Sequence, residues 1–295
     1  MNTFTKFKEK YPLQQQIIGG SSFPYRYYKN ENSDKTVVLL TGGIGLSDLL
    51  VFHFEEFAKS YSVLSFDYPL AYPSNQQLVD AIAELLKSLE IKAFLVGQSL
   101  GGFIAQILAK QHPGVVEGMV LSNTGTLSVD LDEQGTKCLN DMLTSMDKSL
   151  RLMKILPFGL IKKRIKKAVL KKVGQQLDAQ EQMLMTEICD EMVRALTKDY
   201  EIHMTLLMKD LRNYWDMEDG DFEQYKGRVL LILSDDDFTF NENVKQALIN
   251  IMPNPQVITD IRGGHLALLL KLDKYIGAIK EFIDCGPCRL PEWTL

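Results

Sequence analysis

Short apolar runs alternate with amphipathic segments along most of the chain. Runs that are apolar at nearly every position are typical of strands covered on both faces of a parallel sheet. Strands that alternate with helices in this way predict a doubly wound, mostly parallel α/β sheet with right-handed crossovers. The strands are expected at residues 36–43, 62–69, 92–99, 118–125, 228–237 and 255–261.

Two more strands are expected near the N-terminus, where residues 14–20 and 23–30 flank a Gly-Ser-rich turn and predict an antiparallel hairpin. Ser74 and Gln77 have the spacing of a capping box and precede apolar residues at helical spacing. Further helices are expected over residues 99–111, 241–252 and 271–283.

Residues 126–222 interrupt the alternation, because they contain no convincing strand and look helical throughout. We interpret them as a helical cap inserted between two strands of a core domain formed by residues 1–125 and 223–295. Nine of the twelve methionines lie in this segment, where flexible thioethers suit either an adaptable core or an apolar cleft.

One predicted cap helix is strongly basic, since residues 151–177 hold nine Lys or Arg and no acidic residue. Ile161, Ile165, Val169 and Val173 recur every four residues and form an apolar face. The simpler interpretation is a helix packed on one side and solvated on the other. The alternative is weak attraction to an anionic membrane surface or to an acidic acyl carrier.

Composition and net charge favour a globular protein and argue against nucleic-acid binding. Hydrophobic residues at 45% and charged residues at 24% indicate a globular protein, and the net charge of −5 argues against nucleic-acid binding. No apolar run approaches the roughly 20 residues of a membrane span, and residues 1–16 lack a signal-peptide pattern. We therefore expect a cytoplasmic protein, and the sequence makes no prediction about its oligomeric state.

Cys285 and Cys288 form a Cys-Gly-Pro-Cys sequence, the spelling of thioredoxin-like redox sites. That chemistry needs the first cysteine at a helix N-terminus after a strand, where its pKa is lowered. Here the motif follows a predicted helix at the end of the chain, so we interpret it as coincidental. A disulfide, a weak metal site or a redox activity remains the alternative.

The sequence Gly97-Gln-Ser-Leu-Gly101 matches Gly-x-Ser-x-Gly at the junction of an apolar strand and a helix of small residues. A sharp strand-to-helix turn exposes the serine hydroxyl, and flanking glycines relieve crowding there. The helix that follows directs its N–H groups towards developing negative charge. Ser99 is therefore the predicted nucleophile.

A serine hydroxyl needs a base, and His265 is the one histidine that follows the last predicted strand, after Gly263 and Gly264. His53, His112 and His203 are interpreted as packed or surface residues. The base in turn needs an acid, and Ser234-Asp-Asp-Asp237 ends the preceding predicted strand. The order Ser…Asp…His favours a catalytic role for one of these aspartates, and the run lacks the Gly and Glu of a calcium loop.

With these residues the chain resembles the α/β-hydrolase superfamily over nearly its whole length outside the cap. Members commonly end this strand Gly-x-x-Asp with the last Asp as the triad acid, which points to Asp237, although Ser234 replaces the Gly and Asp236 stays an alternative. The resemblance implies an oxyanion hole formed by the N–H groups of Leu100 and Gly43. Thr41 stands where relatives often have His, and Asp67-Tyr-Pro69 departs from the usual Asp-x-x-Gly-x-Gly, which is expected to alter one wall of the site.

The segment YPLQQQII, the glycine-rich loop at residues 41–45 and Tyr68-Pro69 also resemble the maspardin-like branch, some of which is thought to act through binding partners. A histidine is present where the triad needs one, which favours an enzyme. We expect a serine hydrolase that acts on an ester or related small acyl substrate, with no cofactor and no metal. Thioester, amide and carbon–carbon hydrolysis use the same machinery. The alternative is a non-catalytic binding protein that retains the fold.

Overall fold

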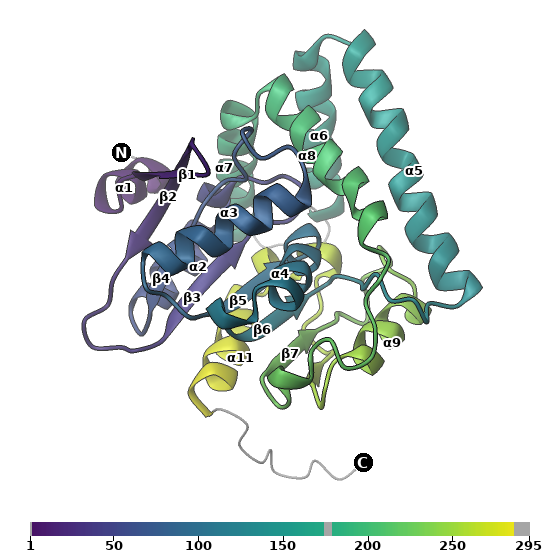
Figure 1. Cartoon of the computed structure of the whole chain (residues 1–295). Coiled ribbons are helices and arrows are strands. Elements are labelled where there is room, and N and C mark those ends of the chain that lie inside the picture. Colours follow the sequence, from purple (N-terminus) through teal and green to yellow (C-terminus); the bar gives the residue numbers. More distant parts are fainter. Residues whose placement is uncertain (1, 174–178, 286–295) are drawn as a thin grey trace.

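The computed structural model describes residues 2–173 and 179–285 (Figure 1). Within these residues, eight strands form one sheet in the order β1-β2-β4-β3-β5-β6-β7-β8. The β1–β2 hairpin and the β2–β4 pair are antiparallel, and all other pairs are parallel. The strands are β1 (Gln14–Ile18), β2 (Ser21–Tyr28), β3 (Thr36–Leu40), β4 (Ser62–Ser65), β5 (Ala93–Gln98), β6 (Val116–Ser122), β7 (Val229–Ile232) and β8 (Gln256–Ile258).

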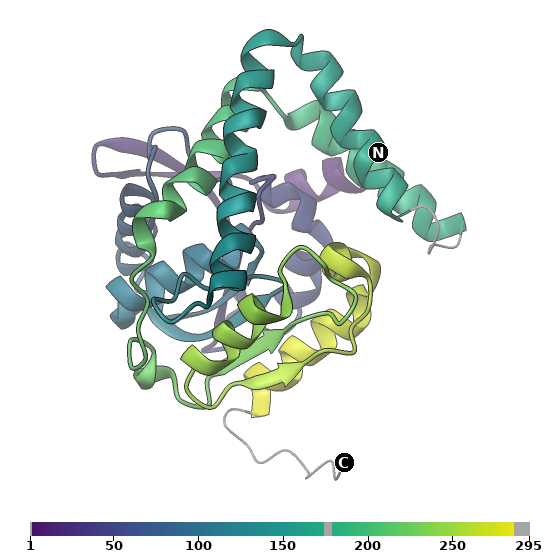
Figure 2. The same ribbon diagram turned by 90° about the vertical axis from the view of Figure 1, so that its right-hand side faces the viewer.

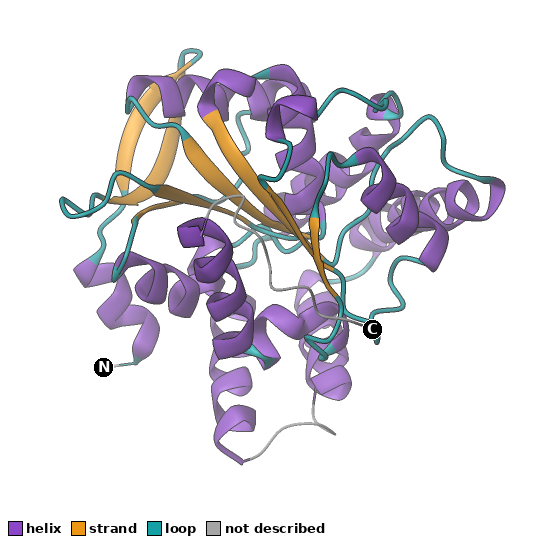
Figure 3. Ribbon diagram, turned by 90° about the horizontal axis from the view of Figure 1, so that it is seen from below, coloured by secondary structure: helices purple, strands orange, loops and turns teal. Residues whose placement is uncertain are grey.

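Helices cover both faces of the sheet (Figure 3). The α-helices of the core are α1 (Thr3–Lys10), α2 (Val51–Ala58), α3 (Asn75–Ser88), α4 (Leu100–Gln111), α9 (Glu242–Ile251), α10 (Ala267–Leu270) and α11 (Leu272–Cys285). Short 3-10 turns lie at Ser47–Leu50, Pro113–Val115, Leu211–Tyr214, Glu223–Tyr225 and Gly264–Leu266. The predicted caps are confirmed, because Ser74 accepts from the N–H of Gln77 and Asn241 accepts from that of Val244.

The continuous apolar runs reflect burial on both faces. In β3, Val38 and Leu40 belong to the core that contains α3, α4 and α9, whereas Val37 and Leu39 belong to the core that contains α2 and α11. Since successive side chains of a strand point to opposite faces, a strand between two helical layers needs apolar residues at every position. The predicted doubly wound architecture is confirmed.

Several strands end earlier than the sequence predicts, and β7 and β4 differ most. β7 ends at Ile232 and not at Asp237, and β4 ends at Ser65 and not at Pro69. The acidic run after β7 bends into a turn closed by the bond from the Asp237 N–H to the Ser234 carbonyl (3.1 Å). The acidic run does not continue the β7 strand, because its carboxylates bond to the loop before α10.

Four helices are inserted between β6 and β7, namely α5 (Glu133–Ile155), α6 (Phe158–Val173), α7 (Ala179–Ala195) and α8 (Lys198–Asp210). They rise from one side of the α/β core (Figure 2), with α5 packed on α8 and α6 packed on α7. A parallel bridge between Ser128 and Met217 joins the segments that enter and leave this insertion. The insertion is the cap, and its boundaries at residues 126 and 222 stay a prediction.

The N-terminal helix α1 ties the cap to the core. Lys8 Nζ lies 2.6 Å from Glu191 Oε1 of α7 and 3.1 Å from Asp48 Oδ2. Asp48 also accepts from Arg26 Nε (3.0 Å), a side chain that is buried in β2. Glu191 is only 3% exposed, whereas the Lys8 side chain is 41% exposed, so the ion pair joins a buried carboxylate of α7 to the surface helix α1.

The basic helix α6 packs as the simpler interpretation predicts. Ile165 and Val169 are partly buried against neighbouring cores, while Lys163, Arg164 and Lys167 are exposed. The side chains of Lys171, Lys172 and Val173 lie outside the described residues. No helix in the described part of the chain is long and apolar enough to cross a membrane.

Candidate active site

Ser99 occupies a strained turn between β5 and α4. Its backbone has φ 53° and ψ −116°, a left-handed conformation that costs a non-glycine residue about 1–3 kcal/mol. Two hydrogen bonds hold it: the Ser99 N–H donates to the Ser122 carbonyl (3.0 Å), and the Thr124 hydroxyl donates to the Ser99 carbonyl (2.7 Å). The turn sets the Ser99 side chain at the carboxyl edge of the sheet.

The two motif glycines are required by close backbone contacts. A Cβ on Gly97 would lie 2.3 Å from the Gly101 carbonyl oxygen, and a Cβ on Gly101 would lie 2.3 Å from the Leu40 carbonyl oxygen. Neither backbone atom has room to move, so any side chain here would push β3, β5 and α4 apart.

His265 and Asp237 form a hydrogen-bonded pair. His265 Nδ1 lies 2.8 Å from Asp237 Oδ2, and the other carboxylate oxygen accepts from the Thr239 N–H (2.9 Å). Asp237 is 2% exposed. Burial raises its pKa, but the hydrogen bonds from His265 and Thr239 outweigh that effect and leave the pKa of Asp237 below its ordinary value. The carboxylate is therefore ionised and fixes Nδ1 of His265 as a donor, so the lone pair lies on Nε2.

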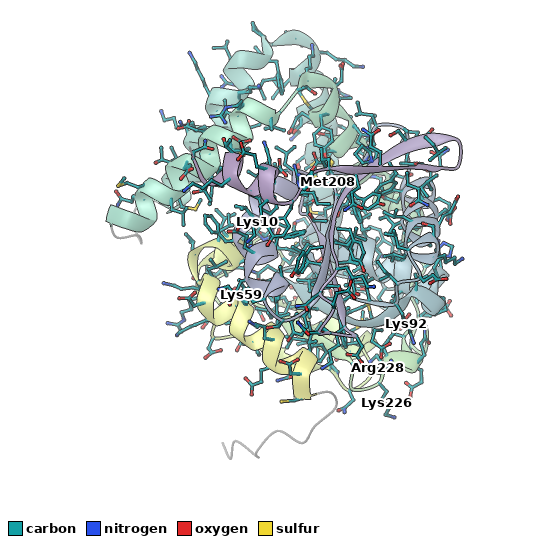
Figure 4. The ribbon with its side chains drawn as sticks, turned by 90° about the vertical axis from the view of Figure 1, so that its left-hand side faces the viewer. Lys10, Lys59, Lys92, Met208, Lys226 and Arg228 are labelled. Atoms are coloured by element: carbon teal, nitrogen blue, oxygen red, sulfur yellow. The ribbon has the colours of Figure 1, made fainter. Side chains whose placement is uncertain are left out.

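Ser99 and His265 line one cavity of about 380 Å³ between the core and the cap. Most of its wall is apolar and comes from the segments 39–50 and 266–269. Met208 of α8, labelled in Figure 4, covers the cavity from the cap side. Among the described residues neither Ser99 Oγ nor His265 Nε2 has a hydrogen-bond partner, so these two atoms are not bonded to each other in this structure.

Gly43 and Leu100 are the predicted oxyanion donors, and Leu100 directly follows Ser99 in the chain. Leu100 is the first residue of α4, so its N–H has no acceptor within the helix. Gly43 also lines the cavity, and a Cβ there would lie 3.2 Å from Met208 Sδ. The loop that holds Gly43 is closed by the bond from the Gly45 N–H to the Gly42 carbonyl (2.9 Å).

A family model of the alpha/beta hydrolase fold matches residues 35–272, most of the chain. The chain belongs to the α/β-hydrolase family. No curated protein matches the sequence.

Solved structures support the same fold. A hydrolase from Pseudomonas aeruginosa has a TM-score of 0.69 at 17% identity, over 92% of this chain and 98% of its own. The enol-lactonase from Burkholderia xenovorans has a TM-score of 0.67 at 17% identity, over 92% and 100%. A thermophilic esterase from Thermogutta terrifontis has a TM-score of 0.65 at 14% identity, over 92% and 98%. At these identities the likeness establishes the fold alone.

The three consecutive aspartates of this α/β-hydrolase have three different partners. Asp237 bonds to His265, whereas Asp236 accepts from the N–H groups of Gly263 (3.0 Å) and Gly264 (2.9 Å). Asp235 pairs with Arg262 at the surface (2.8 Å). Asp236 thus positions the loop that delivers His265, and only Asp237 contacts the imidazole.

Ser234, where relatives have glycine, belongs to a network that the sequence did not reveal. Its hydroxyl donates to the Ile261 carbonyl (2.8 Å) and accepts from Asn123 Nδ2 (3.1 Å). The same Asn123 amide donates to the Gly264 carbonyl (2.9 Å), and its oxygen accepts from the Ser234 N–H (2.9 Å). Asn123 has φ 42°, which aims its side chain between the ends of β6 and β7. The network joins the aspartate turn to the histidine loop.

Thr41 and Tyr68, two positions that depart from the usual pattern of the superfamily, contact each other. Tyr68 is buried, and its hydroxyl donates to the Thr41 carbonyl (2.8 Å) at the start of the glycine loop. Tyr200 of α8 adds a second support, because its hydroxyl donates to the Gly45 carbonyl (2.7 Å) and accepts from the Tyr68 N–H (3.2 Å). The loop that holds Gly43 is therefore supported from the core and from the cap.

The remaining histidines have other roles. His112 bonds to Asp80 at the surface (2.7 Å), and His203 is buried in the cap. The interpretation of His53 as merely packed was incomplete, because this buried residue also lines the cavity. The sequence analysis missed this position because His53 lies in a helix and belongs to no recognised motif.

Cys285, the described cysteine of the Cys-Gly-Pro-Cys motif, does not line this cavity. Cys285 is the last residue of α11, and Cys288 lies outside the described residues. In the described segments no group of three or more His, Cys, Asp or Glu is arranged to hold a metal ion.

Proposed function

We propose that this α/β-hydrolase is a serine hydrolase that cleaves an ester or related acyl compound through Ser99, His265 and Asp237. One observation carries the proposal: a serine held in a strained turn opens onto the same cavity as a histidine oriented by a buried, ionised aspartate. Strained conformations of this kind persist where surrounding hydrogen bonds hold them, as those of Ser122 and Thr124 do here.

In the first half-reaction, Ser99 Oγ attacks the acyl carbonyl carbon while His265 Nε2 takes the hydroxyl proton. Asp237 holds the imidazole and stabilises its positive charge. The N–H groups of Gly43 and Leu100 donate to the oxyanion, and each such donor contributes about 3 kcal/mol. The imidazolium then protonates the departing alkoxide, which leaves an acyl-enzyme on Ser99.

In the second half-reaction, His265 Nε2 takes a proton from water, and the hydroxide adds to the acyl carbon. Collapse of this intermediate breaks the bond to Ser99 Oγ, which recovers its proton from His265. The acid is released, and the enzyme returns to its initial state without a cofactor or a metal.

The largely apolar wall of the cavity favours a small apolar acyl group, and the Met208 thioether of the cap adapts to its shape. Ester hydrolysis is the default reaction, in agreement with solved neighbours described as an enol-lactonase and an esterase. Thioester, amide and carbon–carbon hydrolysis would use the same three residues.

Intact-protein mass spectrometry after treatment with a fluorophosphonate tests the proposal. We expect a single adduct on the wild-type protein, none on Ser99→Ala, and much slower labelling of His265→Ala. Gly43 and Leu100 donate through backbone N–H groups, which a side-chain substitution does not remove. The Gly43 donor is tested by its position: in Gly43→Ala the added Cβ crowds Met208, and turnover of a p-nitrophenyl ester should be lower than in the wild type.

The rival function is a binding protein that keeps the fold, as the resemblance to the maspardin-like branch implies. That protein would give no adduct although circular dichroism showed it to be folded. Absence of labelling with probes of several chain lengths would therefore overturn the hydrolase proposal.

A further inference from the structure

The cavity contains hydrogen-bonding groups that the proposed reaction does not use. Glu201 of α8 enters it from the cap, and His53 of α2 enters it from the core. Among the described residues that line this cavity, none is Lys or Arg. Glu201 carries the one carboxyl group among the described residues that line the cavity.

The Glu201 carboxylate is unpaired. Its Oε2 atom is buried and has no hydrogen-bond partner in the described part of the chain. The nearby Tyr200 hydroxyl donates to the Gly45 carbonyl, and the Thr205 hydroxyl donates to the backbone carbonyl of Glu201. Burial accordingly raises the pKa of the Glu201 carboxyl above its ordinary value. A buried carboxylate without a partner is costly, so a group that pairs with it gains free energy on binding.

His53 offers a second acceptor. Its Nε2 lies 3.1 Å from the Leu268 carbonyl, which only accepts, so Nε2 carries the hydrogen. Burial lowers the pKa of His53 to about 4, so the ring is neutral and Nδ1 holds a lone pair. This Nδ1 is buried and has no partner among the described residues. Two separate elements thus contribute to the cavity wall residues that each carry a buried acceptor without a partner among the described residues.

We propose that the cavity selects acyl substrates that carry an ammonium group, which pairs with Glu201, and that it rejects substrates that carry a carboxylate. This inference rests on the proposed function only in taking the substrate to be an acyl compound, because recognition by Glu201 requires no reaction at Ser99. His53 accepts a hydrogen bond from a further donor of the same substrate.

Electrostatic interaction with Glu201 favours an ammonium group over a neutral hydroxyl and over a carboxylate. A cation in the desolvated cavity relieves the burial cost of Glu201 and gains a charge-assisted hydrogen bond, whereas a neutral hydroxyl gains only the weaker bond. A carboxylate would bring two like charges together with no Lys or Arg in the described wall to separate them.

Isothermal titration calorimetry with three six-carbon probes tests this selectivity on the full chain: n-hexylammonium, 1-hexanol and hexanoate. We expect hexylammonium to bind at least about 10-fold more tightly than hexanol, and hexanoate to bind most weakly. Glu201→Gln should abolish the advantage of hexylammonium and leave the Kd of hexanol within about twofold.

Asp199→Asn is the matched control, because it removes the same charge from an exposed position two residues away on α8. It should leave all three Kd values unchanged. Equal affinity for hexylammonium and hexanol would overturn the proposal, as would preference for hexanoate or an equal effect of the two variants. Parallel loss of hexanol and hexylammonium binding in Glu201→Gln would instead assign the residue a structural role.

Fluorophosphonate labelling of the same preparation reports on Ser99 independently of these affinities. Selective hexylammonium binding without labelling would support this inference and overturn the hydrolase proposal. Labelling without selectivity would do the reverse.

Discussion

The side-chain amide of Gln98 donates through Nε2 to the backbone carbonyl of His265 across 3.1 Å. Gln98 precedes Ser99 in the chain, so this bond joins the turn of the nucleophile directly to the loop of the base. A Cβ on Gly42 would lie 2.5 Å from Gln98 Oε1, which places the same side chain against the glycine loop. Gln98 thus contacts both the loop that holds His265 and the glycine loop that holds Gly43.

Gln98→Met keeps the length of this side chain and removes the donor. We expect the second-order rate of fluorophosphonate labelling to fall about 5-fold, since one hydrogen bond contributes about 1 kcal/mol to the position of the His265 loop. Labelling kinetics measure the effect, and the melting temperature checks that the fold is intact. An unchanged rate would show that the loop is held without Gln98.

Asp236 and Asp237 give a matched pair, because each loses one charge on conversion to asparagine. Asp237→Asn should lower kcat for a p-nitrophenyl ester by about 10³–10⁴-fold, because His265 would no longer be held with Nδ1 as the donor. Asp236→Asn should lower it far less, because its partners are the N–H groups of Gly263 and Gly264. The reverse order of effects would make Asp236 the triad acid.

Ser234→Ala tests the network at the ends of β6 and β7. The substitution removes the bonds to Ile261 and from Asn123 in a fully buried position, so it should lower the free energy of unfolding by about 1–3 kcal/mol. Urea denaturation measures the loss. Ser145→Ala, on the exposed side of α5, is the control and should change stability by under about 0.5 kcal/mol. Equal losses in both variants would argue against the network.

His53 should make stability depend on pH. Its pKa is lowered to about 4 by burial, against an ordinary value of 6.5, so the unfolded chain binds the proton more readily. The stability is fully present above pH 6.5 and is lost as the pH falls towards 4, by about 3 kcal/mol in total.

His53→Gln retains a donor for the Leu268 carbonyl and does not titrate. The fall in unfolding free energy between pH 7 and pH 4 should therefore be smaller in this variant than in the wild type. Urea denaturation at a series of pH values provides the comparison. Parallel curves for the two proteins would mean that His53 is not neutralised by burial.

The alternative interpretation of α6, weak contact with an anionic membrane surface, stays a prediction that its exposed basic face makes testable. Apolar side chains are exposed at the end of α5 (Leu152 and Ile155) and at the start of α6 (Leu160). Apolar and basic groups are therefore neighbours along this part of the cap. The combination is typical of helices that lie in a lipid interface. Lys163→Glu, Arg164→Glu and Lys167→Glu together should reduce co-sedimentation with vesicles that contain phosphatidylserine.

The matched control reverses Lys59, Lys92 and Lys226, which lie on the core away from the cap (Figure 4) and change the net charge equally. It should bind vesicles as the wild type does. Equal loss in the two triple variants would reduce the effect to net charge, and failure of the wild type to sediment would remove the membrane contact.

The sequence by itself determined the layers of the fold and the order of the chemistry. Apolar runs such as that of β3 were recognisable because both faces of the strand are buried, and Gly97 and Gly101 marked the turn of Ser99 because only glycine tolerates the backbone approach there. These are local constraints, and a local pattern records them.

The tertiary structure alone decided which groups meet. The resemblance pointed to Asp237 and left Asp236 as an alternative, because the separate partners of the three aspartates depend on where β7 ends and how the turn bends. His53 and Glu201 reach one cavity from elements about 150 residues apart in the chain, by a packing of cap on core that no short window of sequence contains. Contacts of this kind depend on packing between distant elements, and therefore only the folded chain specifies them.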